Sequence, residues 1–486
     1  MHGVIAFLAD LGYYVAAALT VLLAVIASGH AILYKRDSRA AVSWVGLIVL
    51  VPVVGALLYA LLGINRIRRN ATWLKADAPR LSGSFATVAA ADRALARHLS
   101  PDDAHLVTLA RYVDRVTRRS LTEGNTVTPL VNGEQAYPAM LEAIAAAERS
   151  VALSTFIFDQ DATGERFADA LQRATRRGVV VRVLIDGLGA RYSWPPIVRA
   201  LKRRGLTVAR FMPTIAPWRA PFWNLRNHRK ILVVDGAVGF TGGMNLRQGH
   251  LVAALPKRPV QDMHFRLAGP VVQHLMEAFA EDWVFTTREL LTGPLWFPPL
   301  VPNGAVAARG ITDGPDEDFE KLRWVLQGAL GVARQSVRIM TPYFLPDATL
   351  VTMLTVAALR GVKVEILLPA KNNHLLVHWA AQAQLWQVVK RDCDVYYTPP
   401  PFDHTKLMLV DHTWVLLGSA NWDPRSLRLN FEFNVECYDA TLATQLGAFM
   451  DAKRDMSRLV TPEELDALSL PIRLRNGIVR LGAPYL

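Results

Sequence analysis

The sequence predicts an α/β protein in which an N-terminal two-helix transmembrane hairpin precedes two pseudo-symmetric α/β/α sandwich halves. Three observations lead to this prediction. A short motif occurs twice with identical internal spacing, the segments around the two copies can be aligned with each other, and two long uncharged stretches lie near the start of the chain. The repeats indicate a duplicated domain, and the uncharged stretches indicate membrane spans.

The uncharged stretches cover residues 11–34 and 40–63, and each is long enough to cross a hydrocarbon core of about 30 Å. A cleaved signal peptide is disfavoured because no basic stretch precedes the first span and a second span follows at once. Two adjacent runs of this length also disfavour buried globular helices. Pro52 and Gly55 predict that the second span is kinked or re-entrant. We therefore expect a membrane hairpin over residues 1–70.

The orientation of this hairpin follows from its basic flanks. Lys35, Arg36 and Arg39 lie between the two spans, and a larger group follows the second span: Arg66, Arg68, Arg69 and Lys75. Basic residues favour the cytoplasmic side, so the larger group predicts a multi-pass protein of the cell membrane with the rest of the chain in the cytoplasm. A helical connector is expected over residues 71–125.

The duplication extends beyond the motif. Residues 150–158 align with 336–344, and residues 177–185 align with 360–368. Each half runs from a strand through a helix (residues 167–177 or 350–360) and a glycine-marked return into a Val/Ile-rich strand, which predicts βαβ units with buried parallel strands. We expect halves over 126–290 and 312–486, joined by a Pro-rich linker at 291–311. A concave site is expected in the seam between them.

The repeated motif combines a His and a Lys two positions apart, an Asp at a turn, and an Asn after the returning strand. Its members are His228, Lys230, Asp235 and Asn245 in the first copy, and His404, Lys406, Asp411 and Asn421 in the second. His and Lys two residues apart on a strand point to the same face. The strands are expected at 230–234 and 406–410, with return strands at 237–241 and 413–417.

Two His, two Lys and two Asn are suited to a phosphate diester. The Lys and Asn side chains would neutralise and orient the non-bridging oxygens, and we add Ser419, beside the second return strand, to this phosphate-binding set. One imidazole can attack phosphorus while the other protonates the leaving alkoxide. A metal site should bring carboxylates or Cys at ligand spacing, so no metal or cofactor is expected. Asp235 and Asp411 are counted with the catalytic motif, although their turn positions favour a structural role.

The twice-occurring His-x-Lys-x4-Asp motif resembles the signature of the phospholipase D superfamily. Residues 340–347 and 423–432 look like the corresponding segments of bacterial cardiolipin synthases. The resemblance implies phospholipase D-like halves with His228 as the nucleophile and His404 as the general acid and base. It also implies a carboxylate behind each histidine, and by position these are Asp262 and Glu432.

The same resemblance implies a cardiolipin synthase of the bacterial inner membrane. Such an enzyme joins two phosphatidylglycerol molecules through a phosphohistidine and releases glycerol, so phosphatidylglycerol and anionic membrane lipids are the expected partners. Phosphatidylethanolamine as donor stays open, as do protein partners. A net charge of +12 suits an anionic bilayer, although basicity alone fits nucleic acid equally well.

Three alternatives are a phospholipase D-type lipid hydrolase or transferase with other donors, a phosphodiesterase or nuclease, and a non-catalytic scaffold. The membrane hairpin disfavours the nuclease, so no nucleic-acid partner is expected. Six intact His, Lys and Asn positions disfavour the scaffold.

Overall fold

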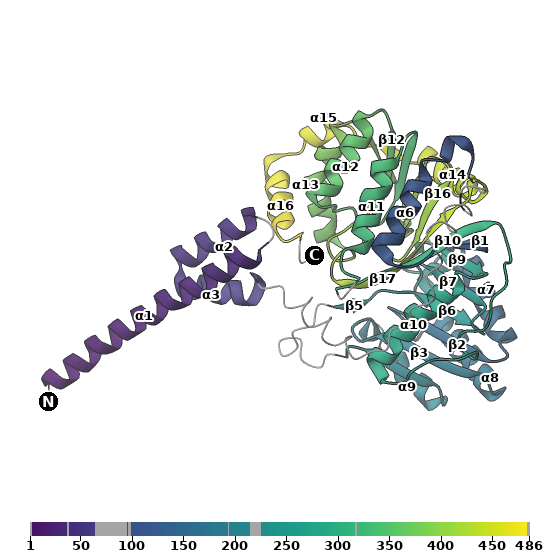
Figure 1. Ribbon diagram of the computed structural model, residues 1–486, viewed down its shortest axis with the longest axis horizontal. Coiled ribbons are helices and arrows are strands. Elements are labelled where there is room, and N and C mark those ends of the chain that lie inside the picture. The colour runs from purple at the N-terminus through teal and green to yellow at the C-terminus, as the bar shows by residue number, and fades with distance from the viewer. Residues whose placement is uncertain are drawn as a thin grey trace. The chain divides into compact units, whose positions relative to one another are not determined.

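Figure 1 shows the computed structural model, which describes residues 2–35, 38–63, 95, 99–192, 194–213, 225–315 and 318–483. The chain divides into two compact units, Met1–Asn70 and Ala71–Leu486. Most of the predicted connector, residues 71–94 and 96–98, lies outside the described residues.

The N-terminal unit is built on helix α1, His2–Tyr34. Its segment Asp10–Tyr34 is long and apolar enough to cross a membrane, and no other helix among the described residues meets that condition. Within Asp10–Tyr34 most of the large apolar side chains are exposed, as expected for a helix that is surrounded by lipid. The first predicted span thus corresponds to one continuous helix.

The second predicted span, residues 40–63, is divided into three helical segments. These residues form α2 (Ser38–Leu50), α3 (Pro52–Leu58) and a π-helical turn (Tyr59–Gly63). At 1.5 Å per residue α2 is about 20 Å long, which is too short for a hydrocarbon core of about 30 Å. The break falls at Pro52, which begins α3, and this agrees with the kink predicted there.

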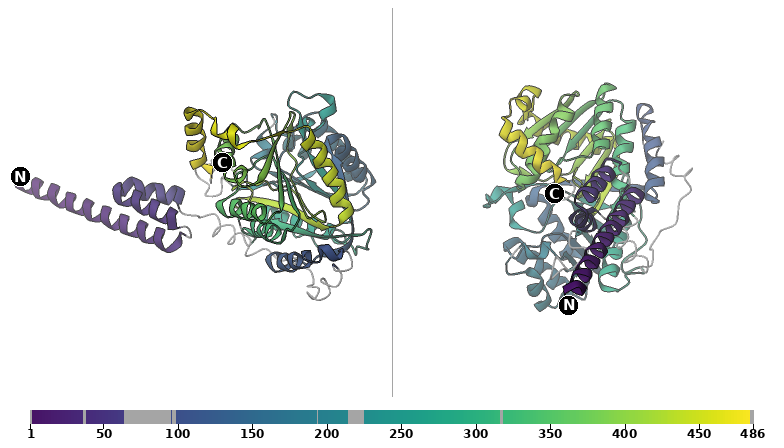
Figure 2. Two further views of the ribbon diagram at one scale, coloured as in Figure 1. Left: turned by 90° about the horizontal axis from the view of Figure 1, so that it is seen from above. Right: turned by 90° about the vertical axis from the view of Figure 1, so that its left-hand side faces the viewer.

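The segment after the break folds back along α2. Gly55 makes the close approach possible, because a Cβ there would lie 2.5 Å from Leu47 O. Further on, Tyr59 shares a 2.7 Å hydrogen bond with His30 Nδ1, and its ring packs edge-on against Trp44 with centroids 5.4 Å apart. His30 lies near the end of α1 and Trp44 lies midway along α2, so residues 52–63 turn back toward the end of the unit where α1 and α2 are joined. Both views in Figure 2 show α2 and α3 beside the later turns of α1.

The second unit contains two halves with matching elements. After α6 (Leu106–Thr117), the elements of the first half are β1 (Thr122–Val131), α7 (Asn132–Ala146), β2 (Ser150–Thr155), α8 (Ala162–Arg176), β3 (Val180–Asp186), α9 (Ile197–Arg203), β4 (Thr207–Phe211), β5 (Arg226–Asn227), β6 (Ile231–Val234), β7 (Val238–Gly242), β8 (Val260–Gln261), β9 (Met263–Ala268) and α10 (Val272–Thr287). Those of the second half are β10 (Val306–Asp313), α11 (Lys321–Val332), β11 (Ser336–Met340), α12 (Ala348–Leu359), β12 (Lys363–Pro369), α13 (Leu375–Val389), β13 (Cys393–Thr398), β14 (Phe402–Asp403), β15 (Leu407–Val410), β16 (Trp414–Gly418), β17 (Asn430–Tyr438) and α14 (Ala440–Asp455). The short β18 (Arg458–Leu459), α15 (Pro462–Asp466) and α16 (Leu470–Leu481) follow.

The strands of both halves form one sheet with an internal pseudo-symmetry. The first half has the order β1-β9-β7-β6-β2-β3-β4 and the second has the order β10-β17-β16-β15-β11-β12-β13. The two orders match strand for strand, and they meet where β1 pairs antiparallel with β10. In each half the βαβ strands are parallel and the motif hairpin is antiparallel, as the aligned repeats predict.

Helices cover both faces of each half-sheet, which gives the predicted α/β/α layers (Figure 1). In the first half α7 and α8 pack together, and α10 contacts the strands separately; α11, α12 and α14 repeat this arrangement in the second half. Equivalent aspartates begin the crossover helices, because Asp161 accepts from Gly164 N at 2.9 Å and Asp347 accepts from Leu350 N at 3.0 Å. Such caps satisfy amides that the first helical turn leaves unpaired.

The halves begin earlier than the expected boundaries. β1 starts at Thr122, inside the predicted connector, and β10 starts at Val306, inside the predicted Pro-rich linker. β10 is buried along its whole length, because it lies at the centre of the sheet and joins the two halves. The proline-rich stretch that suggested a linker ends before this strand.

Candidate active site

Each motif histidine is held by backbone of the opposite half. His228 follows β5, which pairs in parallel with β17, and its amide donates to Phe431 O at 2.9 Å. His404 follows β14, which pairs in parallel with β8, and its amide donates to Gln261 O at 2.8 Å. These two exchanged strands bring both histidines to the junction of the halves.

The predicted carboxylates also cross between the halves. His228 Nδ1 lies 2.9 Å from Glu432 Oε2, and His404 Nδ1 lies 2.9 Å from Asp262 Oδ2. Although burial opposes it, His228 and Lys230 lower the pKa of Glu432; an ionised Glu432 only accepts hydrogen bonds, so Nδ1 of His228 carries the proton and its Nε2 keeps the lone pair. Burial raises the pKa of Asp262 to about 8, so the two carboxyl groups differ in their affinity for a proton. The resemblance identified both carboxylates, but the sequence did not indicate which histidine each one contacts.

Ser419, which was predicted to bind the substrate phosphate, forms a hydrogen bond with Glu432 instead. Its hydroxyl donates to Glu432 Oε2 at 2.6 Å and accepts from Phe433 N at 3.0 Å. Asn430 Nδ2 donates to the other oxygen, Oε1, at 3.0 Å. Together with His228 these contacts fix the Glu432 carboxylate, so the hydroxyl of Ser419 is engaged behind the histidine.

Gly243 occupies the equivalent position in the first half and leaves room for Asp262. A Cβ on Gly243 would lie 2.4 Å from Asp262 Oδ1. The same oxygen accepts from Met263 N at 2.8 Å. The structure therefore places a buried carboxylate directly against this glycine.

The two motif lysines are buried beside the histidines. Lys230 Nζ donates to His228 O at 2.7 Å, and Lys406 Nζ donates to His404 O at 2.5 Å. Burial lowers the pKa of Lys406 to about 8. Burial also lowers the pKa of Lys230 well below its usual value, and the charge of Lys406 in the opposite half contributes to this shift. The two ammonium groups therefore act within one electrostatic site.

Both histidines are neutral at pH 7 before substrate binds. Burial lowers the pKa of His228 to about 4, although Glu432 opposes this shift. Burial also lowers the pKa of His404, and the charges of Lys406 and Lys230 add to the effect. A neutral imidazole presents a nucleophilic Nε2, and a bound phosphate anion would favour the protonated form of its partner.

The motif asparagines occupy equivalent buried positions with different partners. Asn245 Oδ1 accepts from Ile157 N at 3.0 Å, whereas Asn421 Nδ2 donates to Ser426 Oγ at 3.1 Å. Asn421 Oδ1 is buried without a hydrogen-bond partner among the described protein atoms. Both amides follow the returning strands of the motif hairpins, as predicted.

The motif aspartates lie at the far ends of the hairpins and do not join the histidines. Asp235 accepts from the amides of Arg149 and Ser150 at 2.7 and 2.8 Å, and Asp411 accepts from the equivalent amides before β11. Each Asp lies five positions after its motif Lys, beyond a four-residue strand, which corresponds to roughly 16 Å. Their inclusion with the catalytic residues is therefore corrected: they fix the starts of β2 and β11.

Aromatic rings next to the histidines were not anticipated from the sequence. Phe156 packs edge-on against His228 with centroids 5.4 Å apart, and Lys230 Nζ lies 5.7 Å from the centroid of the same ring. Tyr343 and Phe402 lie 6.2 and 6.0 Å from His404. Phe156 directly follows β2 and Tyr343 closely follows β11. Their positions just after the predicted parallel strands were the sequence signal from which these aromatic rings could have been placed near the site.

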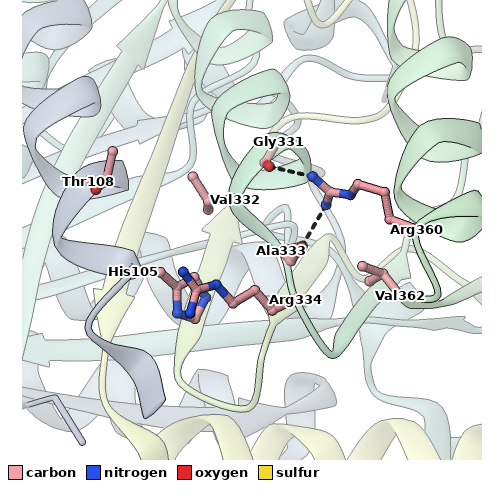
Figure 3. Close-up of a pocket in the computed structure, with 8 residues that line it drawn as sticks. All are labelled: His105, Thr108, Gly331, Val332, Ala333, Arg334, Arg360 and Val362. Atoms are coloured by element: carbon pink, nitrogen blue, oxygen red, sulfur yellow. Dashed lines mark hydrogen bonds between the residues drawn. The ribbon is translucent and has the colours of Figure 1, made fainter. Parts of the chain in front are cut away.

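A cavity of about 470 Å³ in the second half is separate from this site (Figure 3). In this cavity Arg360 donates hydrogen bonds to Gly331 O and Ala333 O. His105 Nε2 shares a hydrogen bond with Asp411 Oδ2. These polar groups hold the end of α11 and the turn at Asp411. Neither motif histidine lines the cavity, so it is not the reaction site.

The fold and the site define a class: a duplicated, phospholipase D-like enzyme with paired histidines at the junction of its halves. The described ranges contain no group of three or more His, Cys, Asp or Glu side chains placed to hold a metal ion. The family model described as "Cardiolipin synthase, PLD-like domain" matches residues 140–283 and 326–453, and a phospholipase D-nuclease N-terminal model matches residues 22–63.

The similarity to cardiolipin synthases of other bacteria covers nearly the whole chain. The chain is 32% identical to the major cardiolipin synthase ClsA of Bacillus subtilis, over 96% of this chain and 97% of that one. It is also 32% identical to cardiolipin synthase A of Pseudomonas fluorescens, over 98% of each chain. A phosphatidylserine synthase from Haemophilus influenzae shares the fold, with a TM-score of 0.62 and 15% identity over 78% of this chain and 100% of that one.

The chain belongs to the cardiolipin synthase family of phospholipase D-like phosphatidyltransferases. Phospholipid substrates and association with a membrane follow from this membership and from the apolar helix α1.

Proposed function

We propose that the protein transfers a phosphatidyl group between two phosphatidylglycerol molecules and so produces cardiolipin and glycerol. The exchange of carboxylates between the halves is the observation that carries the proposal. This exchange brings two neutral imidazoles, each hydrogen-bonded through Nδ1 to a carboxyl group of the opposite half, into one electrostatic site. A two-step transfer needs such a pair, one as nucleophile and one as acid and base.

In the first step, Nε2 of His228 attacks the phosphorus of one phosphatidylglycerol. The bond from phosphorus to the headgroup glycerol breaks, and protonated His404 gives its proton to the departing alkoxide. Glu432 stabilises the positive charge that develops on His228. The negative charge of the diester raises the pKa of His404 above its value in the empty site, so His404 takes up a proton from water when the substrate binds.

In the second step, His404 takes a proton from a headgroup hydroxyl of a second phosphatidylglycerol. The hydroxyl oxygen forms the new bond to phosphorus, and the bond to His228 breaks. Lys230 and Lys406 neutralise the non-bridging oxygens, and Asn245 and Asn421 orient them. Water competes in this step, so the acceptor must be held at high effective concentration, which a bilayer provides.

We also propose that the protein lies in the cytoplasmic membrane and crosses it once, through α1. The contacts of Tyr59 with His30 and Trp44 support a re-entrant α2–α3 pair that enters and leaves on one face. The next unit then follows on the face where α1 ends. This replaces the two-span arrangement expected from the sequence.

A single crossing also explains the basic flanks. With two spans, the basic residues between the spans and those after the second span would lie on opposite faces of the membrane. The positive-inside rule would then favour opposite orientations for the two groups. With a re-entrant pair, all of them lie on the face that carries the catalytic unit: Lys35, Arg36, Arg39, Arg66, Arg68, Arg69 and Lys75. This face is the cytoplasmic one, and the start of α1 lies on the other side.

The reaction is tested on the full-length protein in phosphatidylglycerol vesicles containing EDTA, with lipid analysis by mass spectrometry and a His228→Ala control. Cardiolipin and glycerol that disappear in the control are the expected products. Phosphatidic acid alone would show a hydrolase. Vesicles that also contain phosphatidylethanolamine test the donor, because release of ethanolamine would show that this lipid serves as well.

A further inference from the structure

Helix α16, near the end of the chain, exposes its most apolar side. Leu470, Leu474, Ile478 and Leu481 are 67, 56, 66 and 82% exposed. At about 100° per residue these four side chains fall within roughly 80° of the helix circumference. They form one continuous aliphatic stripe, and no described part of the catalytic unit covers it.

The opposite side of α16 packs on α13 and is more polar (Figure 1). Asn476 is buried there and donates to Gln382 Oε1 at 3.2 Å. The guanidinium of Arg475 lies 4.1 Å from the ring centroid of Trp379. An amphipathic helix of a globular protein normally turns its apolar stripe toward the core. Here an amide and a cation face the protein, and the aliphatic stripe faces outward.

The charges beside the stripe complete the pattern of a helix that lies in a membrane surface. Arg473 and Arg480, which are both exposed, fall along one edge of the stripe, and residues 470–486 contain no acidic side chain. A helix with an aliphatic side and basic flanks inserts its apolar residues at the level of the headgroups and attracts anionic lipids.

We propose that α16 is a membrane-surface helix of the catalytic unit, with its aliphatic stripe inserted among the headgroups of an anionic bilayer. This inference deepens the proposed function, because it gives the catalytic unit a second attachment to the lipid that contains its substrate. α1 anchors the chain, whereas α16 limits how the catalytic unit can rotate above the bilayer.

The N-terminal end of α13 also exposes aliphatic side chains. The contacts of Trp379 with Arg475 and of Ala383 with Arg480 show that α13 and α16 run in the same direction. Leu375 and Leu376, which are 61 and 50% exposed, therefore lie at the same end of the pair as Leu470. An extended aliphatic surface with arginine flanks is complementary to anionic lipid.

The contact is tested with an environment-sensitive fluorophore on Ile478→Cys in the full-length protein. Both native cysteines, Cys393 and Cys437, are buried, so the new thiol is labelled selectively. Leu359→Cys is the matched control, because Leu359 is 63% exposed and also lies on a helix. The labelled proteins are placed in phosphatidylglycerol–phosphatidylcholine vesicles and quenched either by nitroxide-labelled lipid or by aqueous iodide.

The proposal predicts severalfold stronger quenching by nitroxide lipid at position 478 than at position 359, with the opposite order for iodide. Equal access of iodide to both positions would overturn it. Shielding of position 478 from both quenchers would overturn it as well, and loss of that shielding on dilution would identify a second copy of the chain as the occupant.

A second measurement compares Leu474→Glu/Ile478→Glu with the control Leu359→Glu. We expect the α16 variant to make cardiolipin severalfold more slowly in vesicles but at the wild-type rate in mixed micelles, where the lipid reaches the site from any direction. An unchanged vesicle rate would contradict the proposal. If the wild type makes no cardiolipin, the proposed function fails, while the quenching result still decides the membrane contact.

Discussion

At the scale of single residues, the two histidine–carboxylate pairs distinguish positioning from direct participation. Glu432→Gln and Asp262→Asn keep an oxygen near each Nδ1 but remove the charge that stabilises the imidazolium. We expect both to slow cardiolipin formation, whereas His228→Ala and His404→Ala abolish it, since loss of an acid or base costs about 10²- to 10⁴-fold. Initial rates in vesicles provide the measurement.

Glu277→Gln serves as the control for these variants, because Glu277 is also a buried carboxylate but pairs with Arg119 away from the site. It should keep its rate even if it loses stability. Full activity in either histidine variant would contradict the assigned mechanism.

The lysines give the reaction a predictable alkaline limit. Lys406, whose pKa burial lowers to about 8, is charged below that pH and loses its proton as the pH rises through it. The ammonium that neutralises the phosphate is then lost, so kcat/KM should fall above pH 8. Lys406→Arg stays charged at all these pH values; its maximal rate should be lower, but the decline near pH 8 should be absent. The same decline in both proteins would rule out Lys406 as its source.

Much of the residue-level site could be predicted, because the motif fixes which side chains converge. The partners of Ser419 and the role of Gly243 could not, since both depend on strands that pack side by side only after folding. For the two motif aspartates the sequence signals conflicted. Their turn positions correctly indicated a structural role, whereas their place in the motif suggested a catalytic one.

At the scale of elements, Gly243 of the first motif hairpin lies against Asp262, the carboxyl group that contacts His404 of the second half. In Gly243→Ala the new Cβ would fall 2.4 Å from Asp262 Oδ1 and displace the carboxylate that contacts His404. We expect activity to fall at least as far as in Asp262→Asn, with a melting temperature close to that of wild type. The matched control is Gly331→Ala on α11, where the nearest atom is a flexible methionine methyl at 3.5 Å. Equal rates for both variants would show that Asp262 has room to move.

The elements themselves were predictable where the sequence repeats. The βαβ strands, crossover helices and motif hairpins appear in both halves close to their predicted positions, because period-two patterns and glycine-marked returns are local signals. For residues 40–63, Pro52 indicated the break, but hydropathy does not distinguish a kinked span from a re-entrant pair. The fold-back depends on contacts that Gly55 and Tyr59 make with residues distant in the sequence.

At the scale of the whole molecule, the account predicts a single crossing of the membrane. A reporter fused ahead of α1 and the same reporter fused after residue 483 should lie on opposite faces, whereas a two-span hairpin places both on one face. Alkaline phosphatase, active only outside the cytoplasm, should be active in the first fusion and inactive in the second. Both fusions behaving alike would contradict the re-entrant pair, provided that each fusion protein still makes cardiolipin.

The duplication also explains why catalysis requires both halves together. β1 and β10 join the half-sheets, and each histidine depends on backbone and a carboxylate from the other half. The chemistry is therefore a property of the intact catalytic unit, and the first covalent step is its most direct signature.

The central claim is best tested by trapping that step. Wild-type protein is mixed with phosphatidylglycerol vesicles, quenched with base within the first turnover and digested, and the peptides are analysed by mass spectrometry beside a His228→Ala control. The account predicts a phosphatidyl adduct on the peptide that contains His228, and little adduct in His404→Ala, because departure of the glycerol alkoxide needs a proton from His404. An adduct on any other residue, or cardiolipin made at the wild-type rate by His228→Ala, would contradict it.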